Sequence, residues 1–147
     1  MNKKYNVLDL FAGAGGLSLG FELTKLFEIV AAVDNWKPTI DTLKWNKPNS
    51  NIIEFDLELC YTKKGANELI NKIGFDDHIN IVIGGPPCQG MSMAGKRLTD
   101  DPRNNLFKSF VQIVKQIKPD CFLMENVPGL LTSGNIYTGI INAFESI

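Results

Sequence analysis

Five short apolar segments divide the chain, and stretches with helical spacing lie between them. The apolar segments are rich in Val, Ile, Leu and Phe and lack clean polar alternation, which indicates strands buried on both faces of a mostly parallel sheet. Strands and helices that alternate in this way predict an open, Rossmann-like α/β fold with helices on both faces. The predicted strands are Tyr5–Phe11, Ile29–Val33, Asn51–Phe55, Ile79–Ile83 and Cys121–Met124.

Four predicted helices separate these strands: Gly16–Phe27, Pro38–Asn46, Lys64–Ile73 and Pro102–Ile117. A final amphipathic helix starts at Ile136 and reaches Ile147 without a capping glycine or a basic last turn. This pattern fits a frayed terminal helix, and it also fits a chain that ends inside a larger domain. In the longest helix one face carries the apolar residues Leu106, Phe110, Ile113, Val114 and Ile117.

Composition narrows the class of protein. The chain has 147 residues with 15 basic and 16 acidic side chains, a size and balance typical of one globular domain. A net charge of -1 does not indicate a nucleic-acid partner, so any such partner must be inferred from local clusters. Three cysteines without CxxC spacing and a single histidine predict neither a disulfide framework nor a zinc site. Asp9 and four glycines interrupt the first apolar segment, so we expect a cytoplasmic protein without a membrane span.

A glycine-rich turn follows the first predicted strand, with the sequence Asp-Leu-Phe-Ala-Gly-Ala-Gly-Gly from Asp9 to Gly16. Such a turn brings backbone amides close to a ligand. Asp34 ends the second strand, where a carboxylate can accept hydrogen bonds from the hydroxyls of a ribose. Asp56 follows the third strand, where it can accept a hydrogen bond from the amino group of an adenine. Ser18 stands where the dinucleotide fingerprint has its third glycine, which favours an adenosine cofactor without a pyrophosphate. S-adenosylmethionine fits, with its sulfonium against Phe11.

Two further strand ends carry candidate catalytic residues. The fourth strand leads into Gly-Gly-Pro-Pro-Cys-Gln-Gly, in which turn-forming residues present Cys88 as a nucleophile. The fifth strand leads to Glu125, a carboxylate at the edge of an apolar sheet that is suited to general-acid chemistry. We expect the other two cysteines, Cys60 and Cys121, to be structural because each is surrounded by apolar residues.

These motifs, in this order, closely resemble those of the DNA cytosine C5 methyltransferases. The resemblance rests on the glycine turn, Gly-Pro-Pro-Cys-Gln-Gly at 85–90 and Glu-Asn-Val at 125–127. It implies the S-adenosylmethionine-dependent methyltransferase fold, with Cys88 attacking C6 of a flipped cytosine and Glu125 contacting the pyrimidine. Asn35 occupies a position that is apolar or aromatic in many members of the family. The implied cofactor site comprises Phe11, Gly13, Gly15, Gly16, Asp34, Asn35, Asp56, Leu57, Pro87 and Leu106.

A basic segment beside Cys88 agrees with a double-stranded DNA partner. Residues 91–118 contain six basic and two acidic side chains, a local charge of +4 in a chain of -1. We expect Lys96 and Arg97 to contact phosphates, together with Gln89 and Ser92 from the same loop. We expect the basic residues of the following helix, Lys108, Lys115 and Lys118, to lie on its solvent-exposed face. His78 is expected on the surface, and the two tryptophans, Trp36 and Trp45, are expected to pack helices.

Three hypotheses remain open at this point. In the first, residues 1–147 are the cofactor-binding and catalytic part of a C5 methyltransferase, without its target-recognition domain, and act within a longer or two-chain enzyme. The resemblance then implies a role in restriction and modification. In the second, the chain is a module that binds S-adenosylmethionine or DNA without chemistry and needs neither Cys88 nor Glu125. The third, an NAD-linked dehydrogenase, is disfavoured by Ser18 and by the position of Cys88.

Overall fold

A computed structural model describes residues 4–87, 106–132 and 135–147. Its strands form one parallel sheet in the order β3-β2-β1-β4-β5, which confirms the predicted α/β class. Because β1 lies at the centre, the chain reverses its winding direction there, and ligands bind beyond the carboxyl ends of strands at such a point. The strands are β1 (Tyr5–Leu10), β2 (Phe27–Asp34), β3 (Ile52–Glu54), β4 (Ile81–Gly84) and β5 (Cys121–Met124).

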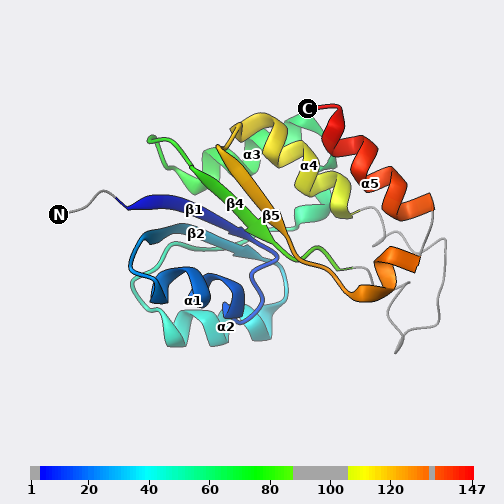
Figure 1. The fold of residues 1–147 in the computed structure, drawn as a ribbon. Helices are drawn as coiled ribbons and strands as arrows, with labels where there is room; N and C mark the ends of the chain where they lie inside the picture. Colours follow the sequence, from blue (N-terminus) through cyan, green and yellow to red (C-terminus); the bar gives the residue numbers. More distant parts are fainter. Residues whose placement is uncertain (1–3, 88–105, 133–134) are drawn as a thin grey trace.

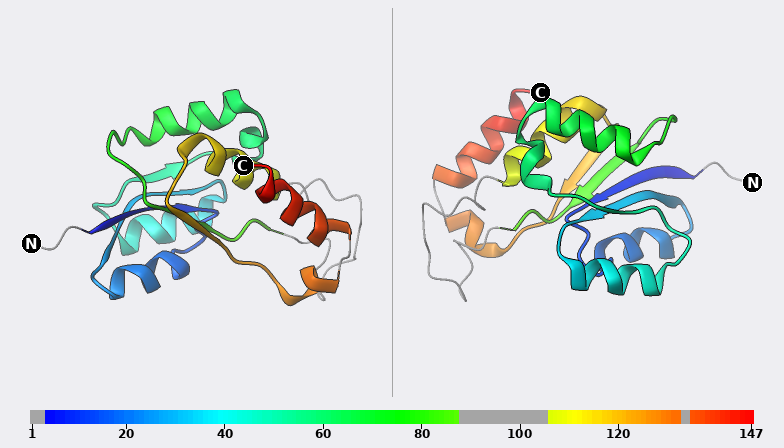
Figure 2. Two further views of the ribbon diagram at one scale, coloured as in Figure 1. Left: turned by 45° about the horizontal axis from the view of Figure 1, so that its top comes forward. Right: turned by 180° about the vertical axis from the view of Figure 1, so that it is seen from behind.

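Helices cover the two faces of the sheet unequally. Two of them, α1 (Gly16–Leu23) and α2 (Lys37–Asn46), lie on one face, and α3, α4 and α5 lie on the other (Figures 1 and 2). Within the described ranges, no helix is long and apolar enough to cross a membrane. The second face is formed by α3 (Lys63–Ile73), α4 (Leu106–Ile117) and α5 (Asn135–Glu145), and two short 3-10 helices, η1 (Leu57–Tyr61) and η4 (Pro128–Thr132), join the sheet to this layer.

The first predicted helix is shorter than expected. Residues 16–27 were predicted as one helix, but α1 ends at Leu23, and the chain turns at Lys25 with a positive φ of 63°. Phe27 then begins β2 and pairs with Tyr5, so strand pairing determines the conformation of a segment whose apolar spacing also suits a helix.

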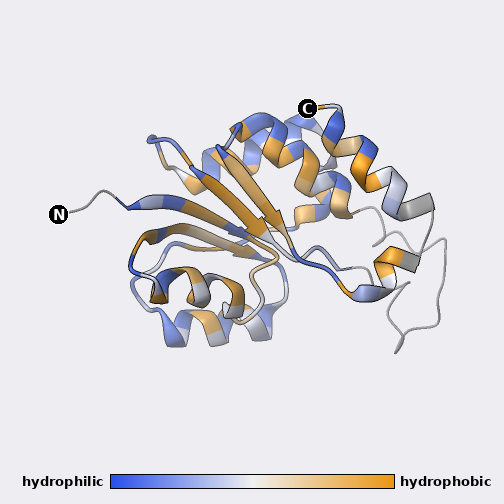
Figure 3. Cartoon of the chain, in the orientation of Figure 1, coloured by the Kyte–Doolittle hydropathy of each residue, from blue (hydrophilic) through white to orange (hydrophobic). Residues whose placement is uncertain are grey.

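The core lies mainly between the sheet and the α3/α4 layer. Leu8, Leu10 and Val82 of the sheet pack against Phe110 and Ile113 of α4, and β4 and β5 are largely hydrophobic (Figure 3). A second cluster surrounds the other side of α4, where Phe107 and Val111 meet η4 and α5. The single apolar face predicted for this helix was therefore too narrow, because α5 covers a second one.

Strand β5 departs from the expectation of strands buried on both faces. It pairs only with β4 in the described sheet, and Phe122 and Leu123 remain 40% and 42% exposed. Cys121 is exposed, so the prediction of a buried structural cysteine there was wrong. The prediction for Cys60 is confirmed: it is fully buried, and this burial raises the pKa of its thiol to about 12, which makes it inert.

Candidate cofactor and catalytic site

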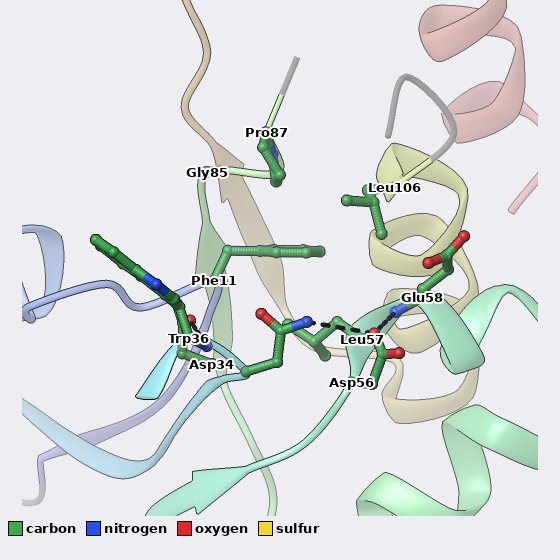
Figure 4. A pocket seen from close by; sticks show the side chains of 10 residues that line it. Phe11, Asp34, Trp36, Asp56, Leu57, Glu58, Gly85, Pro87 and Leu106 are labelled. Carbon is green, nitrogen blue, oxygen red and sulfur yellow. Dashed lines mark hydrogen bonds between the residues drawn. The ribbon is translucent and has the colours of Figure 1, made fainter. Parts of the chain in front are cut away.

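A pocket of about 630 Å³ lies where β1, β2, β3 and β4 end (Figure 4). Its volume falls within the range of small-molecule sites, and its place is the expected one for an open parallel sheet. Seven of the ten predicted cofactor residues line it, which brings together positions spread over most of the chain. The lining comprises Phe11, Asp34, Asn35, Trp36, Asp56, Leu57, Glu58, Gly85, Pro87 and Leu106.

Phe11 enters the pocket from a strained backbone. It follows β1 with φ at 55°, in the left-handed region that a bulky side chain rarely adopts. Its ring projects into the pocket between the ends of the surrounding strands (Figure 4). Strain of this kind persists where the surrounding structure enforces it, and it clusters at binding sites. The geometry therefore supports a ligand-facing role for this ring.

The carboxylate of Asp34 holds the glycine turn against the end of β2. Its Oδ2 accepts a hydrogen bond from the Gly13 amide at 2.8 Å, and its Oδ1 accepts one from the Trp36 amide at 2.9 Å. The Thr39 hydroxyl lies 3.4 Å from Oδ1. A carboxylate has about four acceptor sites, so Oδ2 retains capacity for a ligand hydroxyl. Asp34 thus shapes the turn as well as lining the pocket.

The three predicted glycines lie beside the pocket rather than in its lining. Gly13 has a φ of 56° and open space where a Cβ would project. Gly15 has a φ of 87°, and a Cβ there would lie 2.6 Å from Leu43 Cδ1 on α2. Gly16 begins α1 and has open space around it. The positive φ therefore favours glycine at position 15, and a larger residue would also require the end of the Leu43 side chain to shift.

The third strand contributes a negatively charged wall. Asp56 caps η1 by accepting from the Glu58 amide at 3.0 Å, and Asn35 Nδ2 lies 3.4 Å from the same oxygen. Asp34, Asp56 and Glu58 all line the pocket, and none of its described lining residues is basic. The pocket therefore favours a ligand with positive charge and disfavours one with several negative charges.

Three lining residues were not predicted, namely Trp36, Glu58 and Gly85. Trp36 is 64% exposed at the pocket and Trp45 is 86% exposed on α2, so the prediction that both pack helices was wrong. The missed signal is that Trp36 lies two residues beyond Asp34, just past a strand end. The predictions for His78, Lys108, Lys115 and Lys118 are confirmed, since all four are exposed.

The ends of β4 and β5 stay joined beyond the sheet. The Glu125 amide donates to the Gly84 carbonyl at 2.9 Å, and Asn126 Nδ2 donates to the Pro86 carbonyl at 3.0 Å. Glu125 Oε2 lies 3.0 Å from the point where a Cβ on Gly85 would project. The carboxylate is thus beside the backbone that leads to position 88. Cys88, Gln89, Ser92, Lys96 and Arg97 lie outside the described residues.

The open parallel sheet with a pocket at its carboxyl edge defines an α/β domain, and solved structures of methyltransferases share its fold. A DNA modification methyltransferase encoded within an E. coli prophage has the same fold, with a TM-score of 0.76 and 34% identity over 97% of this chain and 38% of its own. DNMT2 of Spodoptera frugiperda, in mutant form, is similar with a TM-score of 0.66 and 29% identity over 96% of this chain and 41% of its own.

The family itself follows from the sequence comparisons. The profile of C-5 cytosine-specific DNA methylases matches residues 5–147, and the chain belongs to this family. The Type II methyltransferase M1.HphI of Haemophilus parahaemolyticus is 41% identical over 145 residues, which are 95% of this chain and 37% of that protein. M.HgiGI of Herpetosiphon aurantiacus is 45% identical over 82% of this chain and 88% of its own length. The chain thus spans little more than a third of M1.HphI.

Proposed function

We propose that the pocket binds S-adenosylmethionine and that the chain is the cofactor-binding and nucleophile-bearing part of a DNA cytosine C5 methyltransferase. The observation that carries this proposal is the set of three carboxylates, Asp34, Asp56 and Glu58, on a pocket without a described basic residue. S-adenosylmethionine has a net positive charge, whereas the pyrophosphate of NAD carries two negative charges. The acidic lining therefore favours the first ligand over the second.

The residues present fit this cofactor. The free acceptor capacity of Asp34 suits ribose hydroxyls, and Asp56 suits the amino group of an adenine. The ring of Phe11 offers a π face to a sulfonium cation. The amides at the start of α1 suit the carboxylate of the methionine moiety. When bound, S-adenosylmethionine supplies the methyl group.

The chain's own catalytic groups then act on the cytosine. The thiolate of Cys88 forms a bond to C6 of a base flipped out of the duplex, and the electron pair of the C5–C6 double bond moves to C5 and, through C4, toward N3, which makes C5 nucleophilic. Glu125 holds a proton at pyrimidine N3, which supports the charge that develops there. After C5 takes the methyl group, a base removes the C5 proton and the C6–sulfur bond breaks, which restores both the aromatic ring and the thiolate.

We further propose that methylation of double-stranded DNA requires regions that longer relatives carry beyond the part matched here, in the same chain or a second one. The target sequence would be read there, while Gln89, Ser92, Lys96 and Arg97 contact the DNA near the nucleophile. A role in restriction and modification is supported by the Type II methyltransferases to which the chain is similar. The match covers 38% of the prophage protein, which has the same fold. This agrees with a larger enzyme in which other regions carry the remaining functions.

Trp36 offers a direct optical test of where the cofactor binds. We expect S-adenosylmethionine to quench the fluorescence of the wild-type chain, because Trp36 lines the pocket while the other tryptophan, Trp45, lies on the outer part of α2. The Trp36→Phe variant should lose most of this quenching, and the matched Trp45→Phe variant should retain it. Quenching that disappears in Trp45→Phe and persists in Trp36→Phe would place the cofactor elsewhere.

A further inference from the structure

Asp9 is a buried carboxyl at the centre of the sheet. It lies on β1 between Ala32 of β2 and Ile83 of β4, and only 1% of its surface is exposed. Among the described residues, neither of its carboxylate oxygens has a hydrogen-bond partner. Buried polar groups are nearly always paired, so an unpaired carboxylate here is costly and calls for a physical account.

One polar side chain that acts on Asp9 is Ser18, in the first turn of α1. Ser18 is fully buried, and a hydrogen bond from its hydroxyl to Asp9 would lower the pKa of the Asp9 carboxyl. Its Oγ, however, donates to the Gly15 carbonyl at 3.2 Å. A serine hydroxyl has one proton to donate and two lone pairs to accept with. While Ser18 donates to Gly15, it can only accept from Asp9, and this requires a proton on the Asp9 carboxyl.

The charges that face Asp9 do not supply a cation for it. Lys47, which follows α2, lowers the pKa of Asp9, but it is already paired with Glu22 of α1. Asp34 of β2 and Glu22 both act in the opposite direction. Burial is the largest effect and outweighs the lowering by Ser18 and Lys47, so the pKa of the Asp9 carboxyl is raised to about 6.

The direction of this shift fixes its effect on stability. The folded chain holds the Asp9 proton to higher pH than the unfolded chain does, because the pKa is raised from 3.8 to about 6. The contribution of Asp9 to stability is therefore fully present below the unfolded pKa, and it falls as pH rises through the folded one.

We propose that Asp9 acts in its protonated form as a positioning residue: its carboxyl donates to Ser18, which donates to the Gly15 carbonyl, and this relay holds the glycine turn for the cofactor. The relay then contains no buried charge, and one of the two Asp9 oxygens gains a partner. Loss of the Asp9 proton makes the carboxylate compete with Gly15 for the single proton of Ser18. The proposal rests on the proposed function, because it assigns the glycine turn to S-adenosylmethionine.

The test compares wild type with Asp9→Asn, whose amide donates to Ser18 without titrating. S-adenosylmethionine affinity is measured by calorimetry from about pH 5 to pH 8, on either side of the Asp9 pKa. Because both proteins bind the same ligand at each pH, the ratio of wild-type to Asp9→Asn affinity cancels the effect of the ligand's own titration. We expect this ratio to fall with rising pH, by up to about a hundredfold between pH 6 and pH 8, because the protonated fraction of Asp9 falls about tenfold per pH unit above the pKa. Ser18→Ala should bind more weakly and show no such dependence on Asp9.

A constant ratio would show that Asp9 only fills space, and a ratio that rises with pH would show that the charged form assists binding; either result overturns the proposal. Infrared spectra of the ligand-free chain provide a second readout. The wild-type minus Asp9→Asn difference should contain the carbonyl band of a protonated carboxylic acid that disappears near pH 6, and its absence also overturns the proposal. If the band is present but S-adenosylmethionine does not bind, the proposed function fails while the protonated Asp9 stands.

Discussion

Replacement of Cys88 by serine is expected to abolish the covalent adduct with DNA and to reduce methyl transfer by at least about three orders of magnitude. A cytosine ring resists methylation at C5 until a nucleophile adds to C6, and the proposed mechanism contains no other nucleophile. A serine hydroxyl is far less ionised than a thiol near neutral pH, so it cannot take over this role.

The adduct is measured with duplex DNA that carries 5-fluorocytosine at the target position. A base cannot remove fluorine from C5 as it removes a proton, so the C6–sulfur bond cannot break. The enzyme therefore stays covalently attached to the DNA, and this adduct survives denaturation. The assay uses the chain together with the region that longer relatives carry. Cys121→Ser is the matched control, because this exposed thiol lies on β5 rather than in the Pro-Cys-Gln motif. Wild-type methyl transfer by Cys88→Ser would contradict the proposed mechanism.

Replacement of Gly84 by alanine should cause a large loss of stability. Gly84 ends β4 and pairs with Leu10 of β1, and a Cβ on Gly84 would lie 2.3 Å from the Leu10 carbonyl oxygen. Because that atom belongs to the backbone of the central strand, relief requires β1 and β4 to separate at the edge where the pocket lies. Overpacking of this kind costs about 1–3 kcal/mol or more, and we expect a value at or above the upper end.

Gly139→Ala is the matched control for this prediction. Gly139 lies within α5, and a Cβ there meets nothing within 4 Å. Alanine is favoured over glycine inside a helix by up to about 1 kcal/mol, so this variant should unfold at higher urea concentration than wild type. Urea titrations of both variants measure the difference. Equal stability of Gly84→Ala and Gly139→Ala would mean that β1 and β4 do not meet as described.

The sequence was sufficient to predict the parts of the site that local patterns determine. Asp34 and Asp56 each follow an apolar segment, and parallel strands bring their carboxyl ends to one edge, so their meeting in one pocket could be expected. The same reasoning placed Glu125 beside the end of β4, where its amide bonds to Gly84.

Features that depend on tertiary packing escaped prediction. Gly15 resembles any glycine of a ligand-binding turn, and only the structure shows its positive φ and the Leu43 side chain of α2 close to it. The apolar character of Cys121 and its neighbours suggested burial, but whether an edge strand is covered depends on what packs beside it. Trp36 looked like a packing residue because a large aromatic side chain fits both a core and a pocket rim.

The central claim is that the acidic pocket binds S-adenosylmethionine, and calorimetry at neutral pH tests it most directly. Wild type should bind S-adenosylmethionine with one site per chain and more tightly than NAD. Asp34→Asn should lose this binding, because both Asp34 oxygens accept from backbone amides and an amide nitrogen cannot replace either of them. Tighter binding of NAD, or equal binding of S-adenosylmethionine by wild type and Asp34→Asn, would contradict the account.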